Sequence, residues 1–179
     1  MKTRMQIYGN HPLPQPQFPE TSMKKTILIV LTSILLAPAA MAAAARDVTA
    51  PIRQFIDGFN SGDTKSAFAA YATGSIIIVD EFAPHRWLGP HAAQQWATDY
   101  EKHAQATGVS DGQVKYGAPT RTEIEGDVAY VIIPTTYLYK EHGKPTAEEG
   151  EMTFVLHAEA GDWKISGWTW SRVRPHPAK

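Results

Sequence analysis

Residues 48–63 read VTAPIRQFIDGFNSGD, and the architecture expected for the whole chain starts from this stretch. Its apolar side chains recur at the three- and four-residue spacing that places them on one face of a helix. They are Val48, Ile52, Phe55, Ile56 and Phe59. Asp47 or Thr49 can cap the start of this helix, and the Asn-Ser-Gly of residues 60–62 ends it. The stretch therefore predicts an amphipathic helix with one face packed on other elements.

Two more helices and a short strand are expected directly downstream. Asp63 can cap a second, shorter helix, and the SIIIV run of residues 75–79 is β-branched, which predicts a strand. A loop with Pro84 follows, and Pro90 stands where the first turn of a third helix tolerates proline. The apolar face of the second helix consists of Ala67, Phe68 and Tyr71. That of the third helix consists of Ala93, Trp96, Ala97 and Tyr100.

In the second half of the chain the apolar residues alternate instead of following the helical spacing, which predicts strands. Residues 114–125, 128–140, 149–159 and 163–173 alternate or are rich in β-formers, and short Gly-containing turns separate them. Short links join antiparallel neighbours. We therefore expect an α+β domain with three N-terminal helices on one face of a curved antiparallel sheet.

The N-terminal residues predict an export signal. Lys24 and Lys25 precede an apolar run at 27–37, Pro38 follows, and alanines at 39–45 offer cleavage sites. The alternative is an uncleaved membrane anchor, but that run is far shorter than the roughly 20 residues that span a bilayer. We interpret residues 1–22 as a start-site artefact or disordered extension, 23–45 as a signal peptide, 46–175 as the domain and 176–179 as a tail. A periplasmic or secreted protein, without membrane association after cleavage, follows.

Composition excludes several kinds of site. The 179 residues contain no cysteine, which removes disulfides, thiolate metal sites and cysteine nucleophiles. The 17 Lys+Arg nearly balance 18 Asp+Glu, so no nucleic-acid surface is expected. P-loop, G-x-G-x-x-G and G-x-S-x-G motifs are absent, and no histidine pair has metal-ligand spacing. We expect no cofactor and no metal.

The helical stretch and the last strands resemble the SnoaL-like, ketosteroid isomerase-like family of the nuclear transport factor 2-like superfamily. The resemblance lies in residues 53–63, in residues 75–89 and in the tryptophan-rich segments 163–165 and 168–173. It implies a cone-shaped cystatin-like fold around an apolar pocket, a small apolar or aromatic ligand, and a homodimer formed through the open face of the sheet.

The same resemblance implies where catalytic groups stand. The family places a carboxylate base after the first strand, where this chain has Asp80 or Glu81. It also places a tyrosine donor where Phe55 stands, and an acid near Thr153 and Val155, where this chain has none. An oxyanion donor is worth on the order of 3 kcal/mol, so steroid isomerisation by that mechanism is not expected.

Two interpretations of the acidic pair remain open at the sequence level. Asp80 or Glu81 can be a general base with a raised pKa, assisted by His85 or His91. Alternatively both acids are solvated at the end of a strand. Adjacent strand residues point to opposite sides, so we expect at most one of them to face the pocket. His103 and His142 are expected at the surface.

Ten residues are predicted to line the pocket. They are Phe55, Phe59, Tyr71, Trp87, Trp96, Tyr100, Thr153, His157, Trp168 and Trp170. Alternation places Ser166 and Arg172 on the face of Trp168 and Trp170. His157 shares a face with Glu151, Thr153 and Val155, and whether that face is concave or convex is left open.

The function is open between two classes. One is a small-molecule enzyme that transfers a proton, of isomerase, dehydratase or cyclase type; the other is a non-catalytic ligand-binding or association domain. An open cavity with an inward carboxylate and a nearby donor favours catalysis. A cavity filled by Trp168, Trp170 and Tyr137 favours the second class.

Overall fold

A computed structural model describes residues 47–172 and 176–177. The chain divides into units Met1–Ile34 and Leu35–Lys179, and every described residue belongs to the second. The predicted signal peptide and residues 1–22 therefore lie outside the described residues. Among the helices that are described, none is both long and apolar enough to cross a membrane.

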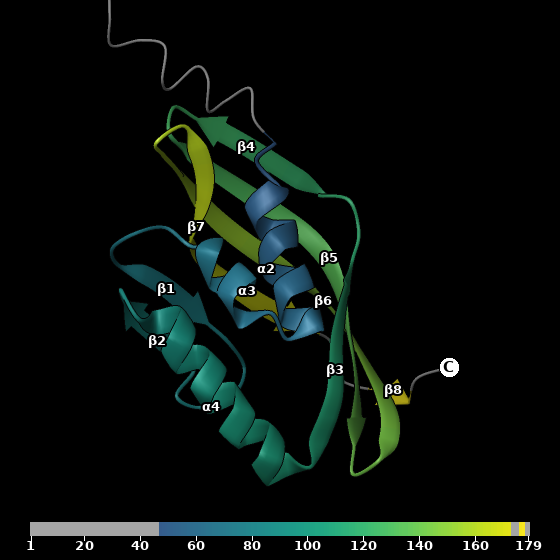
Figure 1. The fold of residues 1–179 in the computed structure, drawn as a ribbon. Helices are drawn as coiled ribbons and strands as arrows, with labels where there is room; N and C mark the ends of the chain where they lie inside the picture. The colour runs from purple at the N-terminus through teal and green to yellow at the C-terminus, as the bar shows by residue number, and fades with distance from the viewer. Residues whose placement is uncertain (1–46, 173–175, 178–179) are drawn as a thin grey trace, which may run out of the picture. The chain divides into compact units, whose positions relative to one another are not determined.

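The elements follow the predicted order of two helices, a strand, a third helix and then the long strands (Figure 1). The helices are α2 (Ala50–Ser61), α3 (Thr64–Ala69) and α4 (Ala92–Thr107). The strands are β1 (Ile76–Val79), β2 (Arg86–Gly89), β3 (Val109–Tyr116), β4 (Arg121–Glu125), β5 (Val128–Glu141), β6 (Lys144–Glu159), β7 (Asp162–Arg172) and β8 (His176–Pro177). Strands β2 and β8 were not predicted.

The first two helices start and stop at the residues that the sequence marks. Thr49 is the N-cap residue of α2 but makes no side-chain capping hydrogen bond, and the carboxylate of Asp47 accepts from the Thr49 amide at 2.9 Å just before the helix begins. Gly62 ends α2 with a φ of 74°, a left-handed conformation that glycine adopts without steric cost. Asp63 then caps α3 by accepting from the Ser66 amide at 3.0 Å. The turn between the helices is thus set by side chains that lie within one short stretch.

The sheet is mixed, which corrects the prediction of an antiparallel sheet. Its main order is β2-β1-β7-β6-β5-β3, and β1 lies parallel to β7 while the other pairs are antiparallel. Strand β1 approaches β7 at Gly167, where any side chain would collide with Ile77. The parallel pair joins segments almost ninety residues apart, so no short turn in the sequence could reveal it.

Strands β5 and β6 are the two longest strands of the sheet and lie next to each other. They pair without interruption from Val128 opposite His157 to Glu141 opposite Lys144. The segment 114–125, predicted as one strand, is divided into β3 and β4, and both pair with β5.

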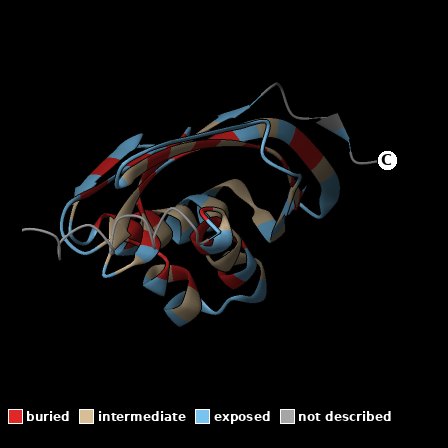
Figure 2. Ribbon diagram, turned by 90° about the horizontal axis from the view of Figure 1, so that it is seen from above, coloured by how far each residue is buried: buried red, intermediate tan, exposed pale blue. Residues whose placement is uncertain are grey.

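The helices lie on one side of the curved sheet, and the buried residues of the strands face them (Figure 2). In β5 every second residue from Ala129 to Tyr139 is buried. In β7 the alternation is broken, because Leu156 pairs with Ile165 while Val155 pairs with Gly167. Ser166 is the extra residue of this bulge, so it does not share the face of Trp168 as expected.

The opposite face of the sheet carries an apolar row. Leu88, Ile77, Gly167 and Val155 lie in register across β2, β1, β7 and β6. The three side chains of this row are 58%, 43% and 39% exposed. Large apolar side chains in a contiguous exposed group are unusual on a monomer surface.

Candidate functional site

A cavity of about 310 Å³ opens between the concave face of the sheet and the helices α2 and α4. Aromatic side chains form most of its wall, and a few ionisable groups stand among them. The aromatic residues are Phe55, Phe59, Phe82, Trp96, Tyr100, Tyr137, Tyr139, Trp168 and Trp170. The ionisable residues besides the tyrosines are Asp80, Glu81, His103, Glu141, Glu148 and Arg172. A cavity of this size and lining suits a small, largely apolar molecule.

Asp80 is the buried acid of the cavity. It directly follows β1 and is only 8% exposed. The indole nitrogen of Trp96 donates to its Oδ2 at 2.8 Å, and the amide of Glu81 donates to its Oδ1 at 2.7 Å. Burial raises the pKa of Asp80 from 3.8 to about 6, against the opposing effect of the Trp96 hydrogen bond. Desolvation therefore dominates, and the carboxyl is a stronger base than an exposed aspartate.

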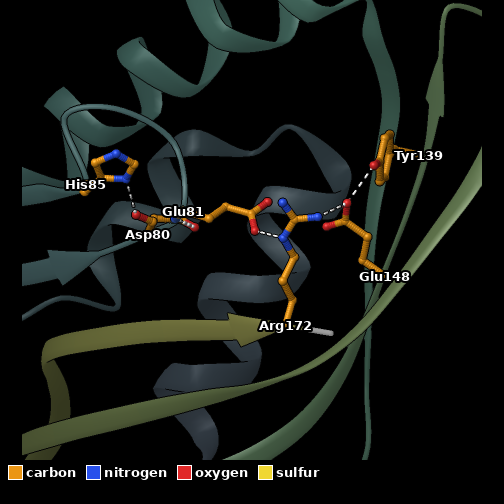
Figure 3. A network of polar contacts seen from close by, with 6 residues as sticks. All are labelled: Asp80, Glu81, His85, Tyr139, Glu148 and Arg172. Atoms are coloured by element: carbon orange, nitrogen blue, oxygen red, sulfur yellow. Dashed lines mark hydrogen bonds and ion pairs between the residues drawn. The ribbon is translucent and has the colours of Figure 1, made fainter. Parts of the chain in front are cut away.

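Glu81 reaches the same cavity and joins a charged network (Figure 3). Arg172 forms ion pairs with Glu81 and with Glu148, the latter at 2.7 Å. Tyr139 donates to the same Glu148 oxygen at 2.7 Å. Burial raises the pKa of Glu148. One arginine thus joins two carboxylates that come from opposite sides of the cavity.

The expectation that only one of Asp80 and Glu81 faces the cavity is not met. That expectation assumed that both residues belong to a strand, but β1 ends at Val79. The chain turns at this point, so strand alternation no longer applies to the two acids. Both of them line the cavity.

The two histidines expected to assist the acid lie outside the cavity lining. His85 is exposed with a φ of 69°, and its Nδ1 lies 3.3 Å from the backbone oxygen of Asp80 rather than from the carboxylate. His91 is exposed at the N-cap of α4. His103, expected at the surface, is exposed but lines the cavity and stacks on Phe82 with ring centroids 5.0 Å apart. The histidine that lines the cavity therefore comes from helix α4.

Four residues predicted to line the pocket lie elsewhere. Tyr71 is buried behind the wall, where its hydroxyl accepts from Trp168 at 2.7 Å. Trp87 is buried on the other side of α4 and donates to Asp99 at 3.0 Å. Thr153 and His157 lie on the convex face, because Met152, Phe154 and Leu156 take the concave positions of β6. The open question about the His157 face is thus answered as convex.

The remaining predicted residues come together as expected from the aromatic pattern. Phe55 and Phe59 of α2, Trp96 and Tyr100 of α4, and Trp168 and Trp170 of β7 all line the cavity.

The ten predicted pocket residues did not include five side chains of β5 and β6, of which Tyr137 was considered only as a residue that could fill the cavity. Thr135, Tyr137 and Tyr139 of β5 and Glu148 and Met152 of β6 also line the cavity. The strict alternation of β5 could have placed its three residues on one face, but it does not say which face is concave.

Tyr100 and Tyr137 hold a pair of hydroxyls at the cavity wall. The two hydroxyl oxygens are hydrogen-bonded to each other. They lie over Gly112 of β3, where a methyl group would collide with both. Burial raises the pKa of both phenols, and the hydrogen bond with Tyr100 raises that of Tyr137 further. Either hydroxyl can be the donor of this hydrogen bond, and the one that accepts keeps its own hydrogen for a ligand.

Within residues 47–172 and 176–177, no cluster of three or more histidine, aspartate and glutamate side chains could hold a metal ion. The polar groups of the cavity wall are carboxylates, hydroxyls, indoles, the imidazole of His103 and the guanidinium of Arg172.

Comparison with known proteins identifies the fold. No family model and no curated protein matches the chain. Among solved structures, a hexachlorocyclohexane dehydrochlorinase (LinA type 2) matches with a TM-score of 0.65 and 12% identity, over 78% of this chain and 92% of that one. A ketosteroid isomerase-like protein from Erwinia carotovora atroseptica matches with a TM-score of 0.55 and 19% identity, over 71% and 94% of the two chains.

A protein from Nostoc punctiforme described as having a cystatin-like fold also matches, with a TM-score of 0.52 and 15% identity over 71% and 75% of the two chains. The chain has a cystatin-like fold. In this cystatin-like domain, the positions where ketosteroid isomerases were expected to carry donors hold Phe55 and the outward-facing Thr153.

The raised pKa of Asp80 predicts a specific dependence of stability on pH. Between about pH 4 and pH 6 this carboxyl binds more protons in the folded than in the unfolded chain, so the free energy of unfolding falls as pH rises. Asp80→Asn removes this effect. The amide of the variant cannot accept from both Trp96 and the Glu81 amide, and this loss is the same at every pH. Relative to that constant loss, we expect the free energy of unfolding of the variant to rise against that of wild type by up to about 3 kcal/mol between pH 4 and pH 8. Urea denaturation at the two pH values measures it.

The matched control is Asp127→Asn, which changes an exposed turn carboxylate on the far side of the sheet. It should alter stability little at either pH. A stability difference between Asp80→Asn and wild type that stays the same from pH 4 to pH 8 would contradict the role of burial in setting this pKa.

Proposed function

We propose that the chain is an enzyme that removes a proton from carbon in a small apolar or aromatic molecule bound in the cavity, with Asp80 as the base. The observation that carries this proposal is a buried carboxylate with a raised pKa in the wall of an aromatic cavity. With a pKa of about 6 the group is ionised at neutral pH and still a strong acceptor of protons. A general base with a pKa near the working pH contributes typically 10²–10⁴-fold in rate.

The cavity also offers groups for the charge that develops on the substrate. As the C–H bond breaks and the Asp80 O–H bond forms, the electron pair moves into the substrate towards an electronegative atom. The hydroxyl of the Tyr100–Tyr137 pair that keeps its hydrogen can donate to that atom, in place of the donors missing at Phe55 and Thr153. Return of the proton at another carbon makes an isomerase, and loss of a leaving group makes a lyase.

The solved structures with this fold support the same reaction class. One is named as a dehydrochlorinase and another as ketosteroid isomerase-like. Both kinds of reaction, elimination of hydrogen chloride and isomerisation of a ketone, begin with loss of a proton from carbon. The alternative of a non-catalytic ligand-binding or association domain has less support, since Trp168, Trp170 and Tyr137 line the cavity without filling it.

A probe reaction tests the base directly. Nitrobenzisoxazole is a small aromatic molecule that loses its ring C–H proton to a base while its N–O bond breaks, which forms a coloured cyanophenolate. We expect the protein to accelerate this opening, with a rate that rises through about pH 6 and then levels off. Asp80→Asn should lower the rate at least about a hundredfold. Absorbance of the phenolate measures both.

Asp127→Asn is again the control, because it removes an aspartate of the same charge from an exposed turn. Its rate should equal that of wild type. If Asp80→Asn turned over the probe as fast as wild type, Asp80 would be excluded as the base.

We further propose export to the periplasm or the extracellular space, on the signal-peptide pattern of residues 23–45. Expression of the full chain in a Gram-negative host should yield a mature product that begins between Ala43 and Arg46. Replacing Lys24 and Lys25 by glutamate should retain the protein in the cytoplasm. N-terminal sequencing of the cell fractions provides the measurement, and peptides from residues 1–22 in the exported product would contradict the proposal.

We also propose that the partner of the exposed sheet face is a second copy of the chain. The apolar row of Leu88, Ile77 and Val155 supports this, since pairing two such faces removes it from water. Sedimentation should give twice the mass of one chain, and Leu88→Arg should give single chains. Gln105→Arg on exposed α4 is the control. A monomeric wild type would refute the dimer.

A further inference from the structure

Three buried polar atoms of the cavity wall have no hydrogen-bond partner among the described residues. They are Thr135 Oγ1, Glu148 Oε2 and Trp170 Nε1, and the residues that carry them line the cavity. Thr135 and Glu148 are only 5% and 3% exposed. Leaving a buried polar group unsatisfied costs about 1–3 kcal/mol, so three in one cavity need an explanation.

The three residues that carry these atoms lie around one glycine of the sheet. Thr135 lies directly opposite Gly150 in the pairing of β5 with β6. The indole nitrogen of Trp170 lies over Gly150, where an added methyl group would collide with it. Glu148 precedes Gly150 by two residues and shares its face of β6. We call Thr135, Glu148 and Trp170 the Gly150 subsite.

The network around Arg172 does not supply a hydrogen-bond partner for Glu148 Oε2. Both Tyr139 and Arg172 bond to Oε1 of Glu148, each at 2.7 Å. The second oxygen of the carboxyl, Oε2, can still accept hydrogen bonds, because no described residue donates to it. Because Oε1 is held from two sides, the side chain cannot turn Oε2 elsewhere without breaking both bonds. Glu148 is therefore oriented in advance of any ligand.

The chemistry of the three atoms selects the ligand group. Trp170 Nε1 can only donate, an ionised Glu148 Oε2 can only accept, and the Thr135 hydroxyl can do either. An ammonium group would leave the indole unpaired, and a carbonyl or ether would leave the carboxylate unpaired. A carboxylate on the ligand would be repelled by Glu148. A hydroxyl donates one hydrogen and accepts others, so it can pair with all three.

We propose that the Gly150 subsite binds a hydroxyl group, so that the molecule held in the cavity is an apolar or aromatic alcohol or phenol. The inference rests on the proposed function only in using the same cavity. It adds the substrate class to that function: the hydroxyl anchors the molecule at Gly150, while Asp80 lies beyond β7 at the end of β1.

Binding of two matched probes tests the subsite. Naphthol and naphthalene share one ring skeleton and differ by the hydroxyl. Equilibrium dialysis against the full chain at pH 7 should give about a tenfold lower Kd for naphthol, as expected for one or two net hydrogen bonds. Thr135→Val and Trp170→Phe each remove one partner and should reduce this preference severalfold.

Thr136→Val is the matched control, since it makes the same replacement on the next residue of β5, which faces the other side of the sheet. The wild-type preference should persist in it. Equal Kd values for the two probes in wild type would overturn the inference, and so would a preference that survives both Thr135→Val and Trp170→Phe.

The two proposals fail separately. Loss of the naphthol preference leaves the elimination of nitrobenzisoxazole and its dependence on Asp80 standing. Conversely, a wild type that prefers naphthol but does not open nitrobenzisoxazole retains the Gly150 subsite and refutes Asp80 as a base.

Discussion

The hydrogen bond from Trp96 to Asp80 joins helix α4 to the end of β1, and the site is organised around it. It fixes a carboxylate that burial would otherwise destabilise, and it offsets part of the desolvation that raises the pKa. The indole of Trp96 also packs edge-on against Trp168 with ring centroids 5.2 Å apart. One side chain thus closes the aromatic wall and holds the acid within it.

In the cavity one guanidinium group forms ion pairs with two carboxylates. Arg172 pairs with Glu81 and Glu148, while Asp80 is paired with an indole and a backbone amide. Asp80 therefore has no directly bonded cation to lower its pKa. Burial therefore dominates at Asp80, while Glu81 and Glu148 are held by Arg172. Because Asp80 is buried and ionised at neutral pH, it lowers the free energy of unfolding there.

Much of this arrangement could be read from local patterns. The helix at 48–59, its end at Gly62 and the strand at 75–79 follow from spacing, caps and β-branching, which act over a few residues. The aromatic pattern also named Phe55, Trp96 and Trp168, because large apolar side chains on a helix or strand face are buried wherever that face packs.

The errors came from features that depend on distant segments. Alternation grouped His157 with Thr153 correctly but could not say that their face is convex, since curvature follows from where the helices pack. The bulge at Ser166 changed the register of β7, and the end of β1 at Val79 released both Asp80 and Glu81 into the cavity. A one-residue change in register exchanges the two faces of a strand, so small irregularities had large effects on the site.

The amino-acid sequence was sufficient for the class of fold, the order of its elements and the acidic position after the first strand, because these depend on short-range periodicity and on side-chain type. The parallel contact of β1 with β7, the turning of Glu148 and Thr135 into the cavity and the pKa of Asp80 required the folded chain. Each depends on which segments enclose a group and exclude water from it, and this enclosure is produced by residues that lie far apart in the sequence.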